Sequence, residues 1–197
     1  MEPKSTGQKY DKIASWWHQR HHNSEYGVAQ FKRALSYCHN PLAALDVGCG
    51  AGGRFINILE SQNIAVTGID VSSEMISLAK KNHPSQVFIE DDICSWDSAE
   101  KFDLIYAWDS LFHLPINEHI NVITKLANQL NQKGILLYTF GDGDGEHLDT
   151  WLDDTFYYSS IGVANNLALL TELDCKILHM EFDQFPQPHV YVIAQKL

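Results

Sequence analysis

The sequence predicts an α/β fold with a doubly wound, mostly parallel sheet of seven strands whose last strand is antiparallel. From residue 43 to residue 140, apolar strand-like runs alternate with helical patterns, which favours a parallel sheet with right-handed crossovers. A glycine-rich turn, Gly48–Gly53, joins the first strand to the helix that follows it. Near the C-terminus only Gln184–Pro188 separates two strand-like runs. That segment is too short for a crossover helix, so these two strands are expected to pair as an antiparallel hairpin.

The expected elements follow one another without a repeat or a low-complexity segment. Apolar residues at helical spacing predict two N-terminal helices, in Tyr10–Trp17 and Val28–Cys38. The expected strands are Ala43–Val47, Ala65–Asp70, Gln86–Asp91, Leu104–Trp108, Ile135–Phe140, Cys175–Asp183 and His189–Lys196, and the expected helices between them are Gly53–Ser61, Ser73–Lys81, Asn117–Leu130 and Ser160–Leu173. We expect one domain over residues 1–197, with a helical lid in residues 1–40 and the α/β core in residues 41–197.

Length, composition and charge favour a small-molecule enzyme over a nucleic-acid or membrane protein. The 197 residues, 45% of them hydrophobic, suit one α/β domain with a sizeable core. The formal net charge of −11 argues against nucleic acid, whose binding needs clustered Lys and Arg. No apolar run approaches the ~20 residues that span a bilayer. We therefore expect a small-molecule substrate, no nucleic-acid partner, no membrane association, and a monomer or homodimer.

The cysteines and the N-terminal residues predict a cytoplasmic location. Residues 1–6 lack the apolar segment of a signal peptide. Cys38, Cys49, Cys94 and Cys175 show no C-x-x-C spacing, so neither disulfides nor a zinc site are expected.

Two polar clusters have part of a metal-site pattern, and neither is complete. His18 and His22 are spaced i, i+4, but no Asp or Glu at helical spacing completes a ligand set. Asp142–Glu146 has the acidic spacing of a calcium loop, but His147 stands where that loop requires glycine. We expect no metal ion.

The glycine turn indicates a nucleotide-type ligand, and by itself it leaves two cofactors open. A strand, a glycine turn and a helix bring bare backbone against a ligand at the carboxyl end of the first strand. Gly48, Gly50 and Gly53 also satisfy the G-x-G-x-x-G dinucleotide pattern, with Asp70 ~20 residues further on. An NAD-dependent oxidoreductase is therefore one alternative.

Three acidic positions favour a different cofactor. Asp46 lies two residues before the first glycine, where its carboxylate would repel a pyrophosphate and attract a cationic group. Asp70 ends the second apolar run, and Glu90–Asp92 closes the third. A ligand with an ammonium group, a ribose diol and an adenine would use all three positions, and S-adenosylmethionine is such a ligand.

Five sequence blocks in order resemble the class I S-adenosylmethionine-dependent methyltransferases, in particular the small-molecule group. Asp46–Gly52 stands where that family carries its D-x-G-x-G-x-G cofactor loop. The other blocks are similar to the ribose-binding second strand, the adenine-recognition turn, the fourth strand with its loop, and the turn into the fifth strand; they are Thr67–Met75, Phe88–Ile93, Phe102–Pro115 and Asn131–Leu137. The resemblance covers Tyr10 to the C-terminus and implies a Rossmann-like fold, S-adenosylmethionine as cofactor and S-adenosylhomocysteine as product.

The resemblance implies that each acidic position binds the cofactor. For each position a purely structural role stays open as the alternative. Asp46 would hold the cofactor's ammonium group, or cap the loop. Asp70 would accept both ribose hydroxyls, or cap the next helix. Val71 and Met75 would flank the adenine, or pack in the core. Asp92 would accept from the adenine amino group while the Ile93 amide donates to the ring, or belong to a solvated turn. The full set of expected cofactor contacts is Tyr10, Asp46, Gly48, Cys49, Gly50, Asp70, Val71, Met75, Asp92, Ile93 and Trp108.

The part of the crevice that binds the methyl acceptor, called the acceptor end, is expected after the fourth strand and in the segments that face that strand. Related methyltransferases often carry small residues around the positions of Trp108 and Asp109, so the chain departs from the family there. His113 matches a family histidine by position and is a candidate base, with a capping or core role equally open. The expected acceptor-binding residues are Trp17, Asp109, His113, His147, Tyr157 and His189, and the candidate catalytic groups are His113, His147 and Asp109.

A mobile lid is expected over this crevice, and a dedicated base is not required. The glycines and aromatics of Gly141–Tyr158, with Trp16 and Trp17 from the first helix, suit a loop that closes over bound ligands. Methyl transfer from a sulfonium is an in-line displacement that positioning and desolvation largely accelerate. Because the sequence has no recognisable substrate motif, a non-catalytic protein that binds S-adenosylmethionine as a partner or regulatory subunit stays a second alternative.

Overall fold

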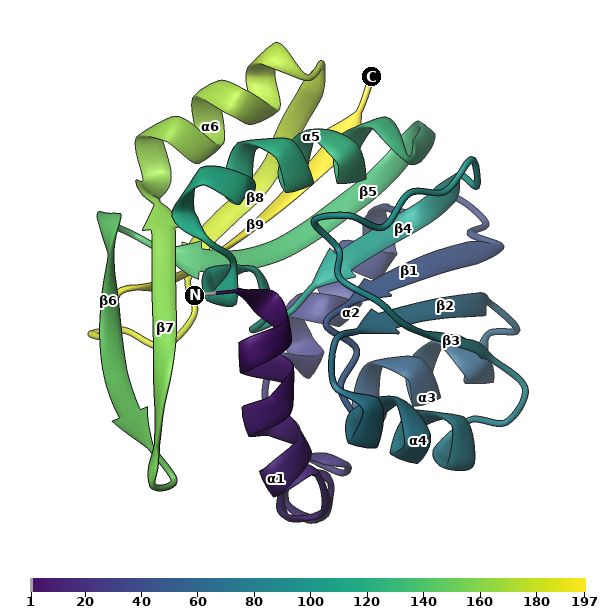
Figure 1. The fold of residues 1–197 in the computed structure, drawn as a ribbon. Coiled ribbons are helices and arrows are strands. Elements are labelled where there is room, and N and C mark those ends of the chain that lie inside the picture. The colour runs from purple at the N-terminus through teal and green to yellow at the C-terminus, as the bar shows by residue number, and fades with distance from the viewer. Residues whose placement is uncertain (1) are drawn as a thin grey trace.

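The computed structural model describes residues 2–197 and contains a central sheet of seven strands with helices on both faces (Figure 1). The strand order is β3-β2-β1-β4-β5-β9-β8. These strands are β1 (Ala43–Val47), β2 (Ala65–Asp70), β3 (Val87–Glu90), β4 (Phe102–Ala107), β5 (Leu130–Gly141), β8 (Cys175–Phe182) and β9 (His189–Lys196). All pairings from β3 to β5 are parallel, whereas β9 is antiparallel to both β5 and β8. The predicted fold class, including the antiparallel last strand, is confirmed.

The helices cover the two faces of this sheet unequally. They are α1 (Pro3–His21), α2 (Val28–Tyr37), α3 (Arg54–Ser61), α4 (Ser73–Asn82), α5 (His119–Asn128) and α6 (Gly162–Glu172), with short 3-10 helices η1 (Leu111–His113) and η2 (Ile116–Glu118). Apolar residues of α2, α3 and α4 form one core cluster with the sheet, and those of α5 and α6 form another. The two predicted N-terminal helices are present, and α1 is longer than its apolar pattern indicated.

Strand β4 shows how one apolar run supplies both cores. Leu104 and Tyr106 belong to the cluster under α2, α3 and α4, whereas Ile105 and Ala107 belong to the cluster under α5 and α6. Successive side chains of a strand point to opposite faces, so a sheet covered on both sides needs continuous apolar strands. The glycine turn after β1 therefore emerges from the middle of a sheet that is buried on both faces.

The segment expected to form a mobile loop is a β-hairpin instead. Strands β6 (Asp144–Trp151) and β7 (Asp154–Ile161) pair antiparallel in a separate two-stranded sheet. Leu152 and Asp153 form its turn, both with positive φ (47° and 61°), as two-residue hairpin turns require. Strand β6 is almost entirely exposed, so it lacks the apolar alternation by which a strand is recognised in a sequence.

Helix α1 lies across the open end of the sheet, between the β6–β7 hairpin and α4 (Figure 1). On the hairpin side, Lys12 Nζ lies 2.7 Å from Asp154 Oδ2. On the other side, Asp11 Oδ1 accepts hydrogen bonds from Ser72 Oγ (2.6 Å) and from the Glu74 amide (3.1 Å). Polar contacts therefore hold α1 from both flanks, and its opening as a lid stays a prediction. Within residues 2–197, no helix combines the length and apolar character needed to cross a membrane.

Replacing Phe31 by Ala tests the packing of α2 on the sheet. The Phe31 side chain is fully buried, with its ring centroid 4.4 Å from that of Phe55 and 4.9 Å from that of Tyr106. We expect Phe31→Ala to lower the free energy of unfolding by about 3–5 kcal/mol, measured by urea denaturation, because it leaves a cavity between well-packed rings. The exposed neighbour Lys32 is the control, and Lys32→Ala should change stability by less than about 0.5 kcal/mol. A loss below about 1 kcal/mol for Phe31→Ala would show that this packing is not required.

Candidate active site

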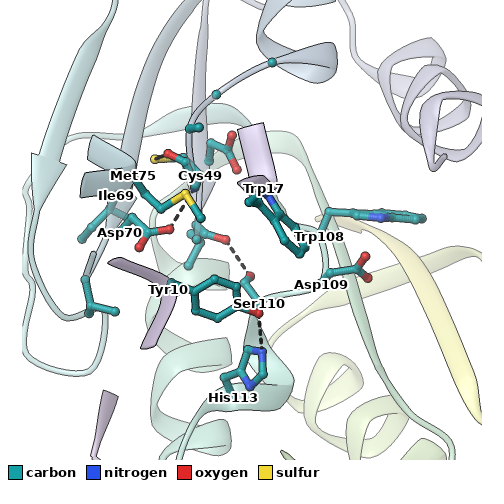
Figure 2. A pocket seen from close by; sticks show the side chains of 18 of the residues that line it. Tyr10, Trp17, Cys49, Ile69, Asp70, Met75, Trp108, Asp109, Ser110 and His113 are labelled. Carbon is teal, nitrogen blue, oxygen red and sulfur yellow. Dashed lines mark hydrogen bonds between the residues drawn. The ribbon is translucent and has the colours of Figure 1, made fainter. Parts of the chain in front are cut away.

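A pocket opens at the carboxyl ends of the parallel strands (Figure 2), and residues of α1 line part of it. The turn after β1, the ends of β2 and β3, and the segment after β4 all contribute to it. Every residue expected to contact the cofactor lines this pocket, namely Tyr10, Asp46, Gly48, Cys49, Gly50, Asp70, Val71, Met75, Asp92, Ile93 and Trp108. Chain segments up to about 100 residues apart in sequence thus meet at one place; their roles toward a ligand stay predictions.

The glycine turn has a backbone that other residues adopt only at a cost. Gly48, Gly50 and Gly52 have φ angles of 75°, 52° and 71°. A Cβ on Gly48 would lie 2.3 Å from Ser110 Cβ, so the close approach of the segment after β4 also requires glycine there. A Cβ on Gly50 would meet only Trp17 and Met75, at 3.9 and 4.0 Å. The space next to Gly50 therefore belongs to the pocket, not to the packed interior.

Asp70 holds the glycine turn from the end of β2. Its Oδ2 accepts a hydrogen bond from the Gly50 amide and its Oδ1 accepts one from the Ser72 amide, both at 2.9 Å. The helix-capping role falls to Ser72, whose Oγ accepts from the Met75 amide at 3.1 Å at the start of α4. Burial raises the pKa of Asp70, and the backbone N–H groups that it accepts from oppose that rise. Each carboxylate oxygen keeps a second lone pair for a ligand.

Asp46 is a buried carboxylate without a basic partner. It is 7% exposed, and within residues 2–197 no Lys, Arg or His nitrogen lies within 4.0 Å of it. Burial raises the pKa of Asp46 to about 7, while the nearby Tyr106 hydroxyl acts in the opposite direction and Asp70 adds to the rise. A buried carboxylate is stable as an anion only with a cationic or hydrogen-bonding partner. A ligand with an ammonium group would supply this cationic partner.

Tyr10 and His113 form a neutral pair at the floor of the pocket (Figure 2). The Tyr157 carbonyl lies 2.9 Å from His113 Nδ1 and can only accept, so Nδ1 carries the proton. His113 Nε2 then accepts from the Tyr10 hydroxyl at 2.9 Å. Burial lowers the pKa of His113 to about 4 and raises that of Tyr10. With its lone pair engaged and its pKa lowered, His113 is better suited to positioning Tyr10 than to acting as a free base.

Asp109 connects the pocket to the β8–β9 hairpin. It adopts a left-handed φ of 55°, and its amide donates to Thr139 Oγ1 at 2.8 Å. His189 Nε2 lies 3.0 Å from Asp109 Oδ1, and His189 Nδ1 lies 3.4 Å from Oδ2 of the buried Asp183. Asp183 in turn accepts a hydrogen bond from the Tyr26 hydroxyl at 2.7 Å. His189 is thus placed behind Asp109 and is not part of the pocket wall.

Two further residues expected at the acceptor end lie outside the pocket wall. His147, on the exposed β6, stacks on Tyr158 with ring centroids 5.3 Å apart. The Tyr157 hydroxyl accepts from the Ile116 amide at 3.3 Å and donates to Glu146. Both residues belong to the β6–β7 hairpin, and the expectation of a loop at this point had placed them too close to the crevice.

The aromatic residues expected in the lid do meet one another. Trp17 lines the pocket and stacks on His21 with centroids 3.9 Å apart. Trp151 of the hairpin contacts both Trp16 and Trp17, at 5.6 and 5.8 Å. The α1–hairpin contact thus closes one side of the pocket with rings.

The pocket also contains residues that the sequence analysis missed. Thr6 Oγ1 and His22 Nδ1 are buried and have no hydrogen-bond partner within residues 2–197, and both residues line the pocket. Arg54 lines it too, with Nε donating to the Tyr26 carbonyl at 2.6 Å. Arg54 directly follows the glycine turn, and that position was the available signal. Thr6 belongs to no motif, and the i, i+4 spacing of His22 with His18 did not indicate the pocket; both residues reach it because α1 lies across it.

Comparison with known proteins agrees with this geometry. Residues 44–134 match a family model described as a methyltransferase domain. Trans-aconitate 2-methyltransferase from Rhizobium etli is 31% identical over 113 residues, which cover 57% of this chain and 43% of that protein. The Escherichia coli enzyme of the same name is 34% identical over 111 residues, covering 56% of this chain and 40% of that one. The matched region therefore spans less than half the length of these curated relatives.

Solved structures share the fold over nearly the whole chain. The DhpI–S-adenosylhomocysteine complex aligns with a TM-score of 0.74 and 17% identity, covering 98% of this chain and 97% of that one. An S-adenosylmethionine-dependent methyltransferase from Clostridium acetobutylicum aligns with a TM-score of 0.73 and 13% identity, covering 95% and 99%. Magnesium protoporphyrin IX methyltransferase from Synechocystis aligns with a TM-score of 0.71 and 17% identity, covering 100% and 98%. At these identities the likeness shows the fold.

Asp46→Asn tests the electrostatics of the ligand-free site. Because the folded-state pKa of about 7 lies above the ordinary 3.8, the folded protein keeps a proton that the unfolded chain releases between roughly pH 4 and pH 7. Ionisation of Asp46 therefore costs stability as the pH rises through this window. We expect the ligand-free variant to be more stable than wild type by about 1–3 kcal/mol at pH 8, with the difference shrinking toward pH 4.

Urea unfolding at several pH values measures this difference. Asp91→Asn, which changes an exposed carboxyl beside the same pocket, is the matched control and should stay within about 0.5 kcal/mol of wild type. An Asp46→Asn variant that is no more stable than wild type at pH 8 would contradict the uncompensated burial of this carboxylate.

Proposed function

We propose that this chain is a class I S-adenosylmethionine-dependent methyltransferase, which transfers a methyl group from S-adenosylmethionine to a small molecule and releases S-adenosylhomocysteine. The observation that carries the proposal is the buried Asp46 beside the left-handed glycine turn, a carboxylate with no ion-pair partner within 4.0 Å among residues 2–197. An ammonium group next to Asp46 would compensate its charge and return its pKa toward the ordinary range.

The residues of the pocket fit the remaining parts of this cofactor. Amides of the glycine turn would donate hydrogen bonds to the cofactor's carboxylate. The remaining lone pairs of the Asp70 carboxylate would accept hydrogen bonds from the ribose hydroxyls. Val71 and Met75 would flank the adenine, with Asp92 and the Ile93 amide at its polar edge. The cofactor, when bound, supplies an activated methyl group on its sulfonium.

What the chain itself contributes is positioning and the exclusion of water. Tyr10, held by His113, and Trp17 present aromatic and hydroxyl groups from α1 to the middle of the pocket (Figure 2). Orientation of two reactants can contribute about 7–11 kcal/mol to an in-line displacement, so no covalent step is required of the protein. A group that accepts a proton matters only for an acceptor that arrives protonated, and Asp109 is the carboxylate at that end of the pocket.

The acceptor end supports a small, polar substrate. Phe112 follows Asp109 closely in the chain, and its ring lies 5.6 Å from that of Tyr158 and 6.2 Å from that of His189. These partly buried rings lie near Asp109, the one of these four residues that lines the pocket. The relatives named as trans-aconitate methyltransferases support a small-molecule acceptor. A single domain over residues 1–197, a monomer or homodimer, and a cytoplasmic location remain part of this proposal.

The two alternative functions are less well supported. A dinucleotide would bring its pyrophosphate toward Asp46 and leave Asp92 without a partner. A non-catalytic binding protein would retain the cofactor residues, yet it gives no reason for the Asp109 carboxylate beside them. The methyltransferase comparisons disfavour both.

Ligand binding and turnover test the proposal directly. S-adenosylhomocysteine at millimolar concentration should raise the melting temperature, because a ligand selective for the folded state stabilises it by mass action, whereas NAD should not. Methyl-labelled S-adenosylmethionine, incubated with a panel of carboxylates (trans-aconitate included), amines and hydroxylated metabolites, should label at least one product. A shift with NAD alone would overturn the proposal; binding without turnover across the panel would favour a binding protein.

Asp70→Asn tests the ribose contact while keeping an oxygen for the glycine turn. We expect the variant to bind S-adenosylhomocysteine more than about tenfold more weakly by calorimetry, because neutral acceptors form weaker hydrogen bonds than carboxylates. An analogue that lacks the ribose hydroxyls should bind variant and wild type almost alike. If the analogue also distinguishes them strongly, Asp70 acts by holding the turn and not through the diol.

A further inference from the structure

The outer half of the glycine turn is held by the end of α4. Asn82 Nδ2 donates to the Ala51 carbonyl at 2.9 Å, and the Gly53 amide donates to His83 Nε2 at 3.1 Å. Asp70 holds the Gly50 amide on the inner half. Side chains from two different elements therefore fix three peptide groups of a turn that has few internal hydrogen bonds.

The tautomer of His83 follows from its second contact. His83 Nδ1 lies 3.0 Å from Glu60 Oε2, and a carboxylate oxygen only accepts. Nδ1 therefore carries the proton, and the lone pair of Nε2 is directed at the Gly53 amide. Glu60 is itself oriented by Ser85 Oγ and Gln86 Nε2, each 3.2 Å from Oε1.

Packing leaves the imidazole little freedom. His83 is 2% exposed, and a Cβ on Gly52 would lie 2.6 Å from His83 Cδ2. Gly53, the residue before α3, has φ 128° and no side chain to cap that helix. The imidazole thus packs against Gly52 and supplies the acceptor that Gly53 lacks locally.

We propose that His83 is a positioning residue of the cofactor site: its neutral imidazole holds the outer half of the glycine turn in the ligand-binding conformation, and Glu60 sets the tautomer that does so. The proposal rests on the proposed function in one respect, that the ligand of the turn is S-adenosylmethionine. A proton on Nε2 would set an N–H donor against the Gly53 N–H donor and release this half of the turn.

Side chains of three elements lie around the His83 imidazole. Glu60 of α3 faces Nδ1, His18 of α1 lies nearby, and the ring centroid of Phe88 of β3 is 6.3 Å from that of His83. A variant that keeps a hydrogen-bond acceptor at the position of Nε2 therefore isolates the contact with the Gly53 amide.

Two substitutions at His83 separate the effect of its hydrogen-bond acceptor from the effect of the volume of its side chain. The amide oxygen of His83→Gln reaches roughly the position of Nε2, whereas His83→Leu fills the space without an acceptor. In the ligand-free protein, followed by NMR, we expect His83→Leu to speed hydrogen exchange at the Gly53 amide by about tenfold or more, and His83→Gln to restore most of the protection.

Affinity for S-adenosylhomocysteine supplies the second readout. At pH 8, His83→Leu should bind about tenfold more weakly than wild type, and His83→Gln within about threefold of it. His39→Leu, an exposed histidine in the segment before β1, is the matched control and should match wild type in both readouts.

Gln and Leu variants that behave alike in Gly53 exchange and in affinity would overturn the proposal. Should His83→Leu not fold, Glu60→Leu keeps the imidazole and removes the group that sets its tautomer. That variant should weaken binding by about threefold or more and speed Gly53 exchange, and wild-type values for both would also overturn the proposal. If wild type binds no S-adenosylhomocysteine but Gly53 exchange responds as expected, the proposed function fails while the positioning role stands.

Discussion

The left-handed glycine turn after β1 is the constraint on which the rest of the pocket depends. Its backbone is bare and strained for other residues, so it cannot hold its own shape through side-chain packing. The shape is imposed by neighbours, chiefly Asp70 from β2, with Asn82 and His83 from α4. The same arrangement that exposes backbone to a ligand thus requires that β2 and α4 be correctly packed before the site exists.

The carboxylates in this pocket favour the binding of a ligand and lower the stability of the ligand-free protein. Asp70 is close enough to Asp46 to add to the rise of the Asp46 pKa, and the buried Asp46 and the partly buried Asp70 both lie at the ends of parallel strands. A protein selected for stability alone would place apolar or paired groups there. The pKa of Asp46, which is raised to about 7, reflects this loss of stability.

Helix α1 completes the site through contacts that reach in three directions. Tyr10 bonds to His113 below, Asp11 to the start of α4, and Lys12 to the β6–β7 hairpin. Asn82 contacts both the glycine turn and His18 of α1. The covering helix and the turn therefore share Asn82 as a contact.

Local pattern determined most of the fold and the centre of the site. Continuous apolar strands, the glycine turn and Asp46, Asp70 and Asp92 are encoded within short segments, because strand burial and turn conformation depend on neighbours in the sequence. Only the tertiary structure decided the rest. The exposed β6 has no apolar alternation, so its strand character comes from pairing with β7. His189 lies behind Asp109, and Thr6, His22 and His83 join the site, because long-range packing brings them there. Such residues carry no local signal, since what fixes their role is a partner tens of residues away.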